Sequence, residues 1–130
     1  MDFKILIAED SYPDQGMYKL AFGEKAIIVD NLQSAIRLAR SWKYDLYVTD
    51  GTYPSTLGGF VETGICFKFY DEIKKINPEA KIILAAKFDL GLPAVKEKYP
   101  DMTYMTKLDA SKNLEKIIAE IRAKRTSLKA

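Results

Sequence analysis

Four charged side chains stand directly after apolar, β-prone segments of the chain. These segments are residues 3–8, 45–49 and 102–105, and the residues at or just after their ends are Glu9 with Asp10, then Asp50, and then Lys107. In open parallel α/β sheets, residues at the carboxyl ends of the strands line the functional crevice. The spacing therefore predicts that three acids and one lysine meet at one edge of a sheet.

The chemistry of such a group follows from repulsion between its carboxylates, which raises their pKa values unless a counter-charge is present. Magnesium suits the group because it binds a few carboxylate oxygens, keeps several waters and leaves positions for a phosphoryl group. With Mg2+ and the Lys107 ammonium neutralising a transferring phosphoryl group, Asp50 can attack in line. The predicted cofactor is Mg2+, and the predicted product is an aspartyl phosphate.

The composition of the chain restricts which other chemistries are open to it. The 130 residues include one cysteine, Cys66, and no histidine. An intrachain disulfide, cysteine–histidine metal sites and a serine–histidine triad are therefore excluded. The net charge is +2, with much of the basic excess in residues 122–129. We do not expect this segment to bind nucleic acid, because it has no interleaved aromatic residues.

The length of the chain suits one domain and leaves no room for a second. We expect residues 1–124 to form that domain and residues 125–130 to form a solvated basic tail. No apolar run approaches the roughly 20 residues that a bilayer span needs, and the amino terminus lacks the pattern of a secretion signal. These observations predict a cytoplasmic protein with no membrane partner.

Apolar β-prone segments alternate with amphipathic helical patterns from end to end. Five strands are expected, at residues 3–8, 26–29, 45–49, 81–86 and 102–105. The helices between them are expected to bury Leu32, Ala35, Ile36 and Ala39; Ile65, Cys66, Phe69, Ile73 and Ile76; and, after Lys107, Leu114, Ile117, Ile118 and Ile121, with a weak helix at about 93–98. Near-continuously apolar strands predict an α/β, doubly wound (βα)5 fold with a parallel five-stranded sheet.

The segment between Asp50 and Gly64 differs from the rest of this pattern. It contains Pro54, Gly58 and Gly59, and this density of glycine and proline predicts irregular structure. Among the tyrosines, Tyr53, within this loop, is the candidate contact for a partner.

The ordered set of strand-end motifs resembles the CheY-like receiver domains of two-component response regulators over nearly the whole chain. The matching segments are Ile5–Asp10 for the acidic pair, Asp45–Asp50 with Pro54 for the phospho-acceptor, and Tyr104–Lys107 for the family's lysine. The resemblance implies the flavodoxin-like strand order 2-1-3-4-5. It also implies that Asp50 accepts a phosphoryl group from a sensor histidine kinase or phosphotransfer protein, while Lys107 contacts that group. The implied magnesium ligands are Asp10, Asp50 and the Thr52 backbone carbonyl, with Glu9 acting through water.

The sequence departs from the family's pattern at several positions. Ala86 stands where the family usually has a threonine or serine whose hydroxyl bonds the phosphoryl group, and Tyr104 stands at the switching aromatic position. Phe88 occupies a position that often tunes access of the hydrolytic water, and Leu108 replaces a common proline. The 51–64 loop is longer than the family's, and we interpret it as a partner-specific surface or a lid.

Three functional hypotheses follow. The leading one is a stand-alone receiver, not a turnover enzyme, that signals to an unknown downstream protein through the face of residues 93–98, the strand 102–105 and the last helix. The alternative is a pseudo-receiver, an interaction module that does not switch on phosphorylation, which Ala86 and the long loop motivate. A haloacid-dehalogenase-type phosphatase is disfavoured, because Val48 occupies the position of that family's nucleophilic aspartate.

Overall fold

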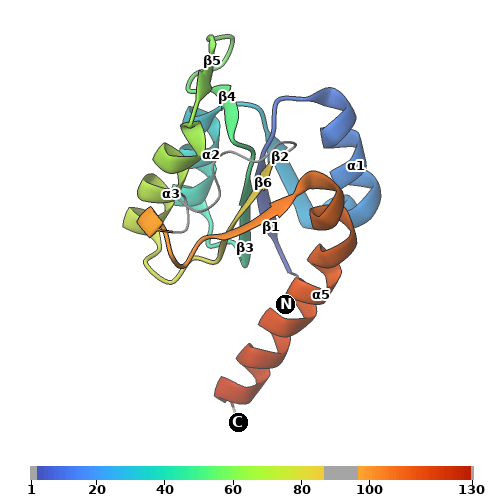
Figure 1. Cartoon of the computed structure of the whole chain (residues 1–130). Helices are drawn as coiled ribbons and strands as arrows, with labels where there is room; N and C mark the ends of the chain where they lie inside the picture. The colour runs from blue at the N-terminus through green and yellow to red at the C-terminus, as the bar shows by residue number, and fades with distance from the viewer. Residues whose placement is uncertain (1–2, 87–96, 130) are drawn as a thin grey trace.

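The computed structural model describes residues 3–86 and 97–129, and its core is a five-stranded parallel sheet (Figure 1). The strands of this sheet are β1 (Ile5–Ala8), β2 (Ala26–Val29), β3 (Leu46–Thr49), β6 (Ile82–Ala86) and β7 (Thr103–Thr106). They lie in the order β2-β1-β3-β6-β7, and every neighbouring pair is parallel. Counted along this sheet alone, the order is the 2-1-3-4-5 that the resemblance implies.

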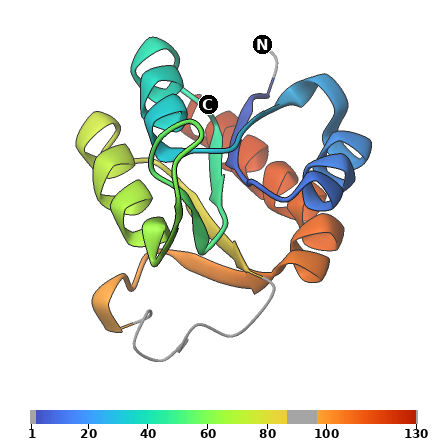
Figure 2. The same ribbon diagram turned by 90° about the horizontal axis from the view of Figure 1, so that it is seen from above.

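Within the described residues, two helices cover each face of the sheet (Figure 2). The helices α1 (Tyr12–Phe22) and α5 (Lys107–Lys129) lie on one face, and α2 (Leu32–Ser41) and α3 (Ile65–Ile76) lie on the other. Successive side chains of a strand point to opposite faces, so Ile5 and Ile7 pack in the core under α1 and α5, while Leu6 and Ala8 pack under α2 and α3. Every residue of β1, β3 and β6 is buried, which explains their continuous apolar character.

The helices follow the apolar spacing of the sequence. The first turn of α2 is capped by the Asn31 side chain, which accepts the Ser34 N–H at 2.8 Å. The expected core residues of α2 and α3 are buried, except Ile36 and Ile76, which are half-buried. In α5, Ile118 is buried, and Ile117 and Ile121 are half-buried. Phe88, most of the weak helix at about 93–98 and the side chains of Leu108 and Leu114 lie outside what the structure describes.

The sequence predicts irregular structure between Asp50 and Gly64, and this prediction is wrong. The segment contains a β-hairpin (top of Figure 1). Strands β4 (Thr52–Pro54) and β5 (Val61–Thr63) pair antiparallel in a separate two-stranded sheet. Gly58 adopts a φ of 73° in the connecting turn, and a Cβ on Gly59 would lie 2.7 Å from the Thr56 hydroxyl oxygen. The glycines therefore close a tight turn between strands.

The carboxyl-terminal helix α5 spans 23 residues and continues through the segment expected to be a separate tail, ending at Lys129. A short 3-10 turn, Gly23–Lys25, joins α1 to β2. None of the helices in the described parts of the chain is both long enough and apolar enough to span a membrane.

Candidate functional site

The structure places the strand-end acids together at the carboxyl edge of the sheet, as the sequence predicts. Glu9, Asp10 and Asp50 each offer a carboxylate oxygen, and these oxygens all lie within 4.8 Å of one another. The register of β1 against β3 causes this meeting: Ala8 is paired with Thr49, and the Asp50 N–H donates to the Ala8 carbonyl at 2.9 Å. The next residues of both strands must therefore emerge side by side.

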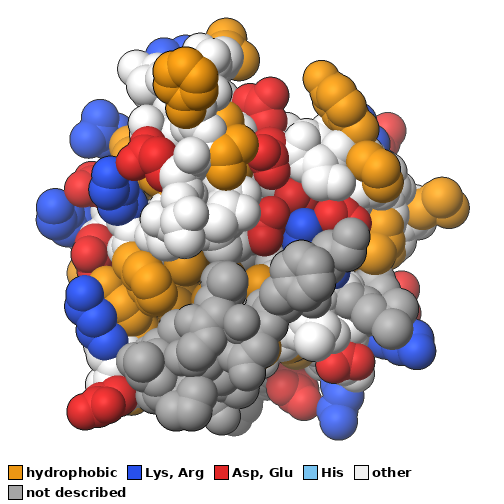
Figure 3. All heavy atoms as spheres, turned by 45° about the horizontal axis from the view of Figure 1, so that its top comes forward, with side chains coloured by type: hydrophobic (Ala, Val, Ile, Leu, Met, Phe, Trp, Pro, Cys, Tyr) orange, Lys and Arg blue, Asp and Glu red, His pale blue; other side chains and the backbone are white. Residues whose placement is uncertain are grey.

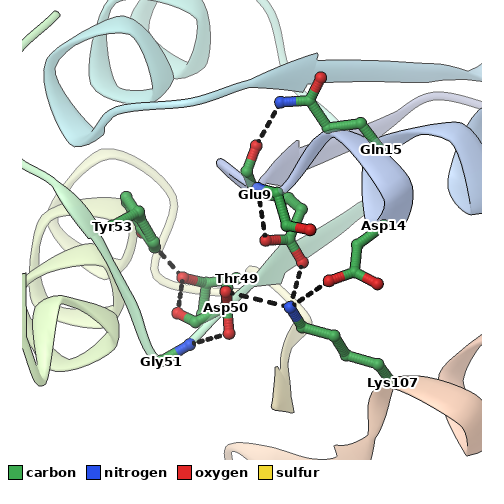
Figure 4. A network of polar contacts seen from close by, with 9 residues as sticks. Glu9, Asp14, Gln15, Thr49, Asp50, Gly51, Tyr53 and Lys107 are labelled. Atoms are coloured by element: carbon green, nitrogen blue, oxygen red, sulfur yellow. Dashed lines mark hydrogen bonds and ion pairs between the residues drawn. The ribbon is translucent and has the colours of Figure 1, made fainter. Parts of the chain in front are cut away.

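Lys107 reaches the same edge from the first residue of α5, directly after β7. Its ammonium nitrogen lies 2.7 Å from Glu9 Oε1, 3.2 Å from Asp50 Oδ2 and 2.7 Å from Asp14 Oδ2 (Figure 4). An ammonium group has three N–H donors, so three carboxylates can share it. The predicted encounter of Lys107 with Glu9 and Asp50 is confirmed in position.

Asp14, in the first turn of α1, is a member of this network that the sequence analysis missed. The apolar periodicity of a helix does not indicate what its polar side chains contact, and an acid in a first turn is ordinarily explained by the helix dipole. The available signal was its place one turn beyond the acidic pair, on the helix that follows β1.

Burial and mutual repulsion change the acid–base properties of the site. The Glu9 side chain is 1% exposed, and burial, reinforced by the neighbouring Asp50 charge and opposed by Lys107, raises its pKa to about 7. Burial also raises the pKa of Asp10, with Asp50 contributing. Burial by itself lowers the pKa of Lys107, but Asp14, Glu9 and Asp50 outweigh it and hold that pKa above its usual value. Negative charge is in excess among these groups.

The group formed by Glu9, Asp10 and Asp50 fits a divalent cation. Its donors are hard carboxylate oxygens, which Mg2+ prefers. A bound cation would offset both the burial and the neighbouring Asp50 charge that raise the pKa values of Glu9 and Asp10. Thr52 is the first residue of β4 and is paired with Thr63. Its carbonyl as a further ligand stays a prediction.

The Asp50 carboxylate is oriented by its own surroundings. Its Oδ1 accepts the Gly51 N–H at 2.7 Å, while its Oδ2 faces Lys107. The Thr49 hydroxyl donates to the Asp50 carbonyl at 2.8 Å and contacts the Tyr53 hydroxyl (Figure 4). Tyr53 is 0% exposed, so the expectation that it contacts a partner is wrong. Its hydroxyl instead joins the first strand of the hairpin to the end of β3.

The two residues assigned to switching by resemblance lie on neighbouring strands. Ala86 ends β6, is buried, and is paired with Thr106 of β7. Tyr104 lies on β7, is half-buried, and packs against the core on the α2 and α3 side. Ala86 has no hydroxyl to offer a phosphoryl group, and the switching role of Tyr104 stays a prediction.

The carboxyl edge opens to the surface between the hairpin and α1. Figure 3 shows acidic side chains with a basic one among them in this gap, and apolar side chains on both flanking elements. The hairpin exposes Leu57, Phe60 and Val61, with Phe60 at 95%, and α1 exposes Tyr12 and Leu20. A molecule that approaches Asp50 from this side meets both elements.

Comparison with known proteins finds similar folds among solved structures but no similar sequence. The sequence matches no family model and no curated protein. Among solved structures, the chemotaxis protein CheY4 of Vibrio cholerae is similar with a TM-score of 0.72 and 16% identity, covering 93% of this chain and 99% of that one. The CheY-like receiver domain protein of Methanospirillum hungatei has a TM-score of 0.71 and 16% identity, covering 98% and 99%.

A third similar structure, the receiver domain from Methylobacillus flagellatus, has a TM-score of 0.70 and 22% identity, with coverage of 93% and 99%. These likenesses extend over nearly the full length of each chain. They agree with the sheet order and with the helices that flank the sheet in the described parts of the chain. The chain has the fold of the CheY-like response regulator receiver domains.

Proposed function

We propose that the protein is a phospho-acceptor receiver in which Asp50 takes a phosphoryl group with Mg2+ beside it. One observation carries this proposal: the Asp50 carboxylate belongs to a three-carboxylate group suited to Mg2+ and also lies 3.2 Å from the Lys107 ammonium. Positive charge then stands on two sides of the acceptor. This arrangement suits phosphoryl transfer, where positioning and electrostatic stabilisation supply most of the catalysis.

In the proposed reaction, an Asp50 carboxylate oxygen attacks the phosphorus of a phosphohistidine. The new P–O bond forms as the P–N bond breaks, and the imidazole of the donor leaves with the electron pair. Lys107 donates a hydrogen bond to the transferred group, and the Gly51 N–H holds the carboxylate in orientation. Asp10, Asp50 and the Thr52 carbonyl would hold magnesium, with Glu9 acting through water, and a bound ion supplies charge neutralisation at the phosphoryl oxygens.

The proposed partners follow from this reaction. The donor is a sensor histidine kinase or a phosphotransfer protein, and the output is contact with a downstream protein whose identity is open. We propose a cytoplasmic receiver that accepts one phosphoryl group, and not an enzyme that turns over a separate substrate.

The second candidate is a receiver-like interaction module that does not switch on phosphorylation. Ala86 favours it, since this buried residue cannot make the hydroxyl contact that couples the phosphoryl group to the neighbouring strand in the family. The two candidates agree on the fold and differ on whether chemistry at Asp50 changes the surface at Tyr104.

Acetyl phosphate with Mg2+, followed by intact-mass measurement, tests the chemistry. We expect wild type to gain the mass of one phosphoryl group and Asp50→Asn to gain none, while Asp109→Asn, which alters an exposed acid of α5, behaves as wild type. An unchanged wild-type mass, together with no effect of beryllofluoride on amide NMR shifts near Asp50, contradicts the proposal. Shifts confined to the site, without change at Tyr104, favour the non-switching candidate.

A further inference from the structure

The three carboxylates that share the Lys107 ammonium fall into two classes. Glu9 and Asp50 belong to the group suited to a divalent cation, whereas Asp14 does not. Asp14 approaches the ammonium from α1, on the side away from Gly51 and Tyr53 (Figure 4). Its oxygen is 2.7 Å from the nitrogen, closer than the Asp50 oxygen at 3.2 Å.

This division matters when a cation binds. Carboxylate oxygens that bind a divalent cation lose part of their interaction with a neighbouring ammonium. The cation and the ammonium also repel each other, because both are positively charged. Glu9 and Asp50 would then hold Lys107 less strongly, while Asp14 would be unaffected. We propose that Asp14 is a positioning residue, which keeps the Lys107 ammonium beside Asp50 when a divalent cation engages Glu9 and Asp50.

Asp14 is well placed for this role because the first turn of α1 is tied to the end of β1. The Gln15 side chain donates to the Glu9 carbonyl at 2.7 Å, and the Gln15 N–H donates to the Ser11 carbonyl at 2.9 Å. Further along the helix, Tyr18 and Phe22 anchor α1 in the core. The Asp14 carboxylate therefore reaches the site from a fixed backbone position.

The proposal rests on the proposed function only for its effect on phosphorylation, because the contact itself can be tested without any phosphoryl donor. The test measures the rate at which acetic anhydride acetylates Lys107, by peptide mass spectrometry, with and without saturating MgCl2. In wild type, we expect Lys107 to stay protected in both conditions. In Asp14→Asn, we expect protection without magnesium and, with magnesium, acetylation at least about tenfold faster, the factor that a charge-assisted hydrogen bond represents.

Two further variants separate positioning from general effects. Asp14→Glu restores a carboxylate on the same helix and should return much of the protection. Asp109→Asn removes an exposed acid two residues after Lys107 without touching the network, and it should match wild type. Circular dichroism of each variant verifies the fold, since loss of an acid in the first turn of α1 also weakens a helix-dipole interaction.

Three outcomes overturn the proposal. The first is that, with magnesium, Lys107 is acetylated equally slowly in wild type and in Asp14→Asn. The second is that Asp14→Asn is acetylated equally fast with and without magnesium, and the third is that magnesium makes Lys107 of wild type reactive. If magnesium-dependent exposure appears in Asp14→Asn but acetyl phosphate never modifies wild type, the positioning role stands and the phospho-acceptor function fails. If both hold, Asp14→Asn should be phosphorylated about tenfold more slowly at saturating Mg2+, with unchanged Mg2+ affinity.

Discussion

The hydroxyl oxygens of Thr49 and Tyr53 lie 2.8 Å apart in the interior, immediately before and after the turn that carries Asp50. Thr49 donates its single hydroxyl hydrogen to the Asp50 carbonyl, so the Tyr53 hydroxyl must donate to Thr49. Both side chains are fully buried. This chain of hydrogen bonds joins strand β3, which precedes Asp50, to the hairpin strand β4.

We expect Tyr53→Phe to lower the free energy of unfolding by about 1 kcal/mol, because it removes the donor from a buried hydrogen bond but keeps the ring. Urea denaturation measures this change. Thr49→Val should cost more, since it leaves both the Asp50 carbonyl and the Tyr53 hydroxyl without this partner. In the double variant the two costs should be less than additive, and strict additivity would show that the two hydroxyls do not interact.

Removal of the Lys107 ammonium should destabilise the protein through the acids that share it. Without a cation, Lys107→Met should cost about 3 kcal/mol, because Glu9 is left buried beside Asp50 with no neutralising partner. Magnesium should restore part of this loss, which thermal unfolding with and without MgCl2 measures. The matched control is Lys68→Met, whose exposed ion pair with Glu62 should contribute less than about 1 kcal/mol and show no magnesium dependence.

Magnesium should stabilise the folded state through the carboxylate group. At ten times its dissociation constant, a ligand that binds only the folded state adds about 1.4 kcal/mol to the free energy of unfolding. Asp10→Asn should lose most of this increment, and Asp109→Asn should keep it. An equal magnesium effect in both variants would place the ion elsewhere.

A hydroxyl at position 86 should strengthen the response of Tyr104 to a phosphoryl mimic at Asp50. We expect Ala86→Thr to enlarge the beryllofluoride-induced NMR shifts at Tyr104 relative to wild type, because the added hydroxyl can bond the phosphoryl mimic at the end of β6. Ala86→Val adds similar bulk without a hydroxyl and controls for packing. Identical shifts in all three proteins would separate Tyr104 from the chemistry at Asp50.

Cys66 should be unreactive in the folded protein. It is fully buried, and burial raises the pKa of its thiol to about 11. At pH 8 about one thiol in a thousand is then ionised, so Ellman's reagent should react at least about a hundredfold faster in urea. Because the pKa is raised on folding, the free energy of unfolding should fall by up to about 1.4 kcal/mol per pH unit between pH 9 and 11. Cys66→Ala should show a shallower decline.

The sequence was sufficient for the parallel sheet and for the meeting of Glu9, Asp50 and Lys107. Continuous apolar strands separated by helical patterns leave few topologies, and in a parallel sheet the ends of the strands share an edge. Residues that directly follow neighbouring strands therefore meet at this edge, independent of the side chains between the strands. Their positions were therefore predictable, although their roles remain for experiment.

Asp14 and the hairpin required the structure for different reasons. Asp14 depends on the rotation of α1 about its axis and on the reach of one side chain, which apolar periodicity does not specify. The hairpin strands have three residues each, too few for alternation to be recognised, and Gly58 and Gly59 of the turn dominate the local composition. A glycine cluster between short β-prone segments predicts a turn better than it predicts a loop.

The hairpin has a consequence for engineering, because β4 and β5 pair with each other and with no strand of the main sheet. Exchange of the turn residues between Pro54 and Val61 leaves the register of the five parallel strands untouched. The turn can therefore accept a grafted peptide or a fluorophore, on a hairpin that the buried Tyr53 hydroxyl joins to the end of β3. A reporter placed there would respond to structural changes near Asp50 and would leave the five-stranded sheet unaltered.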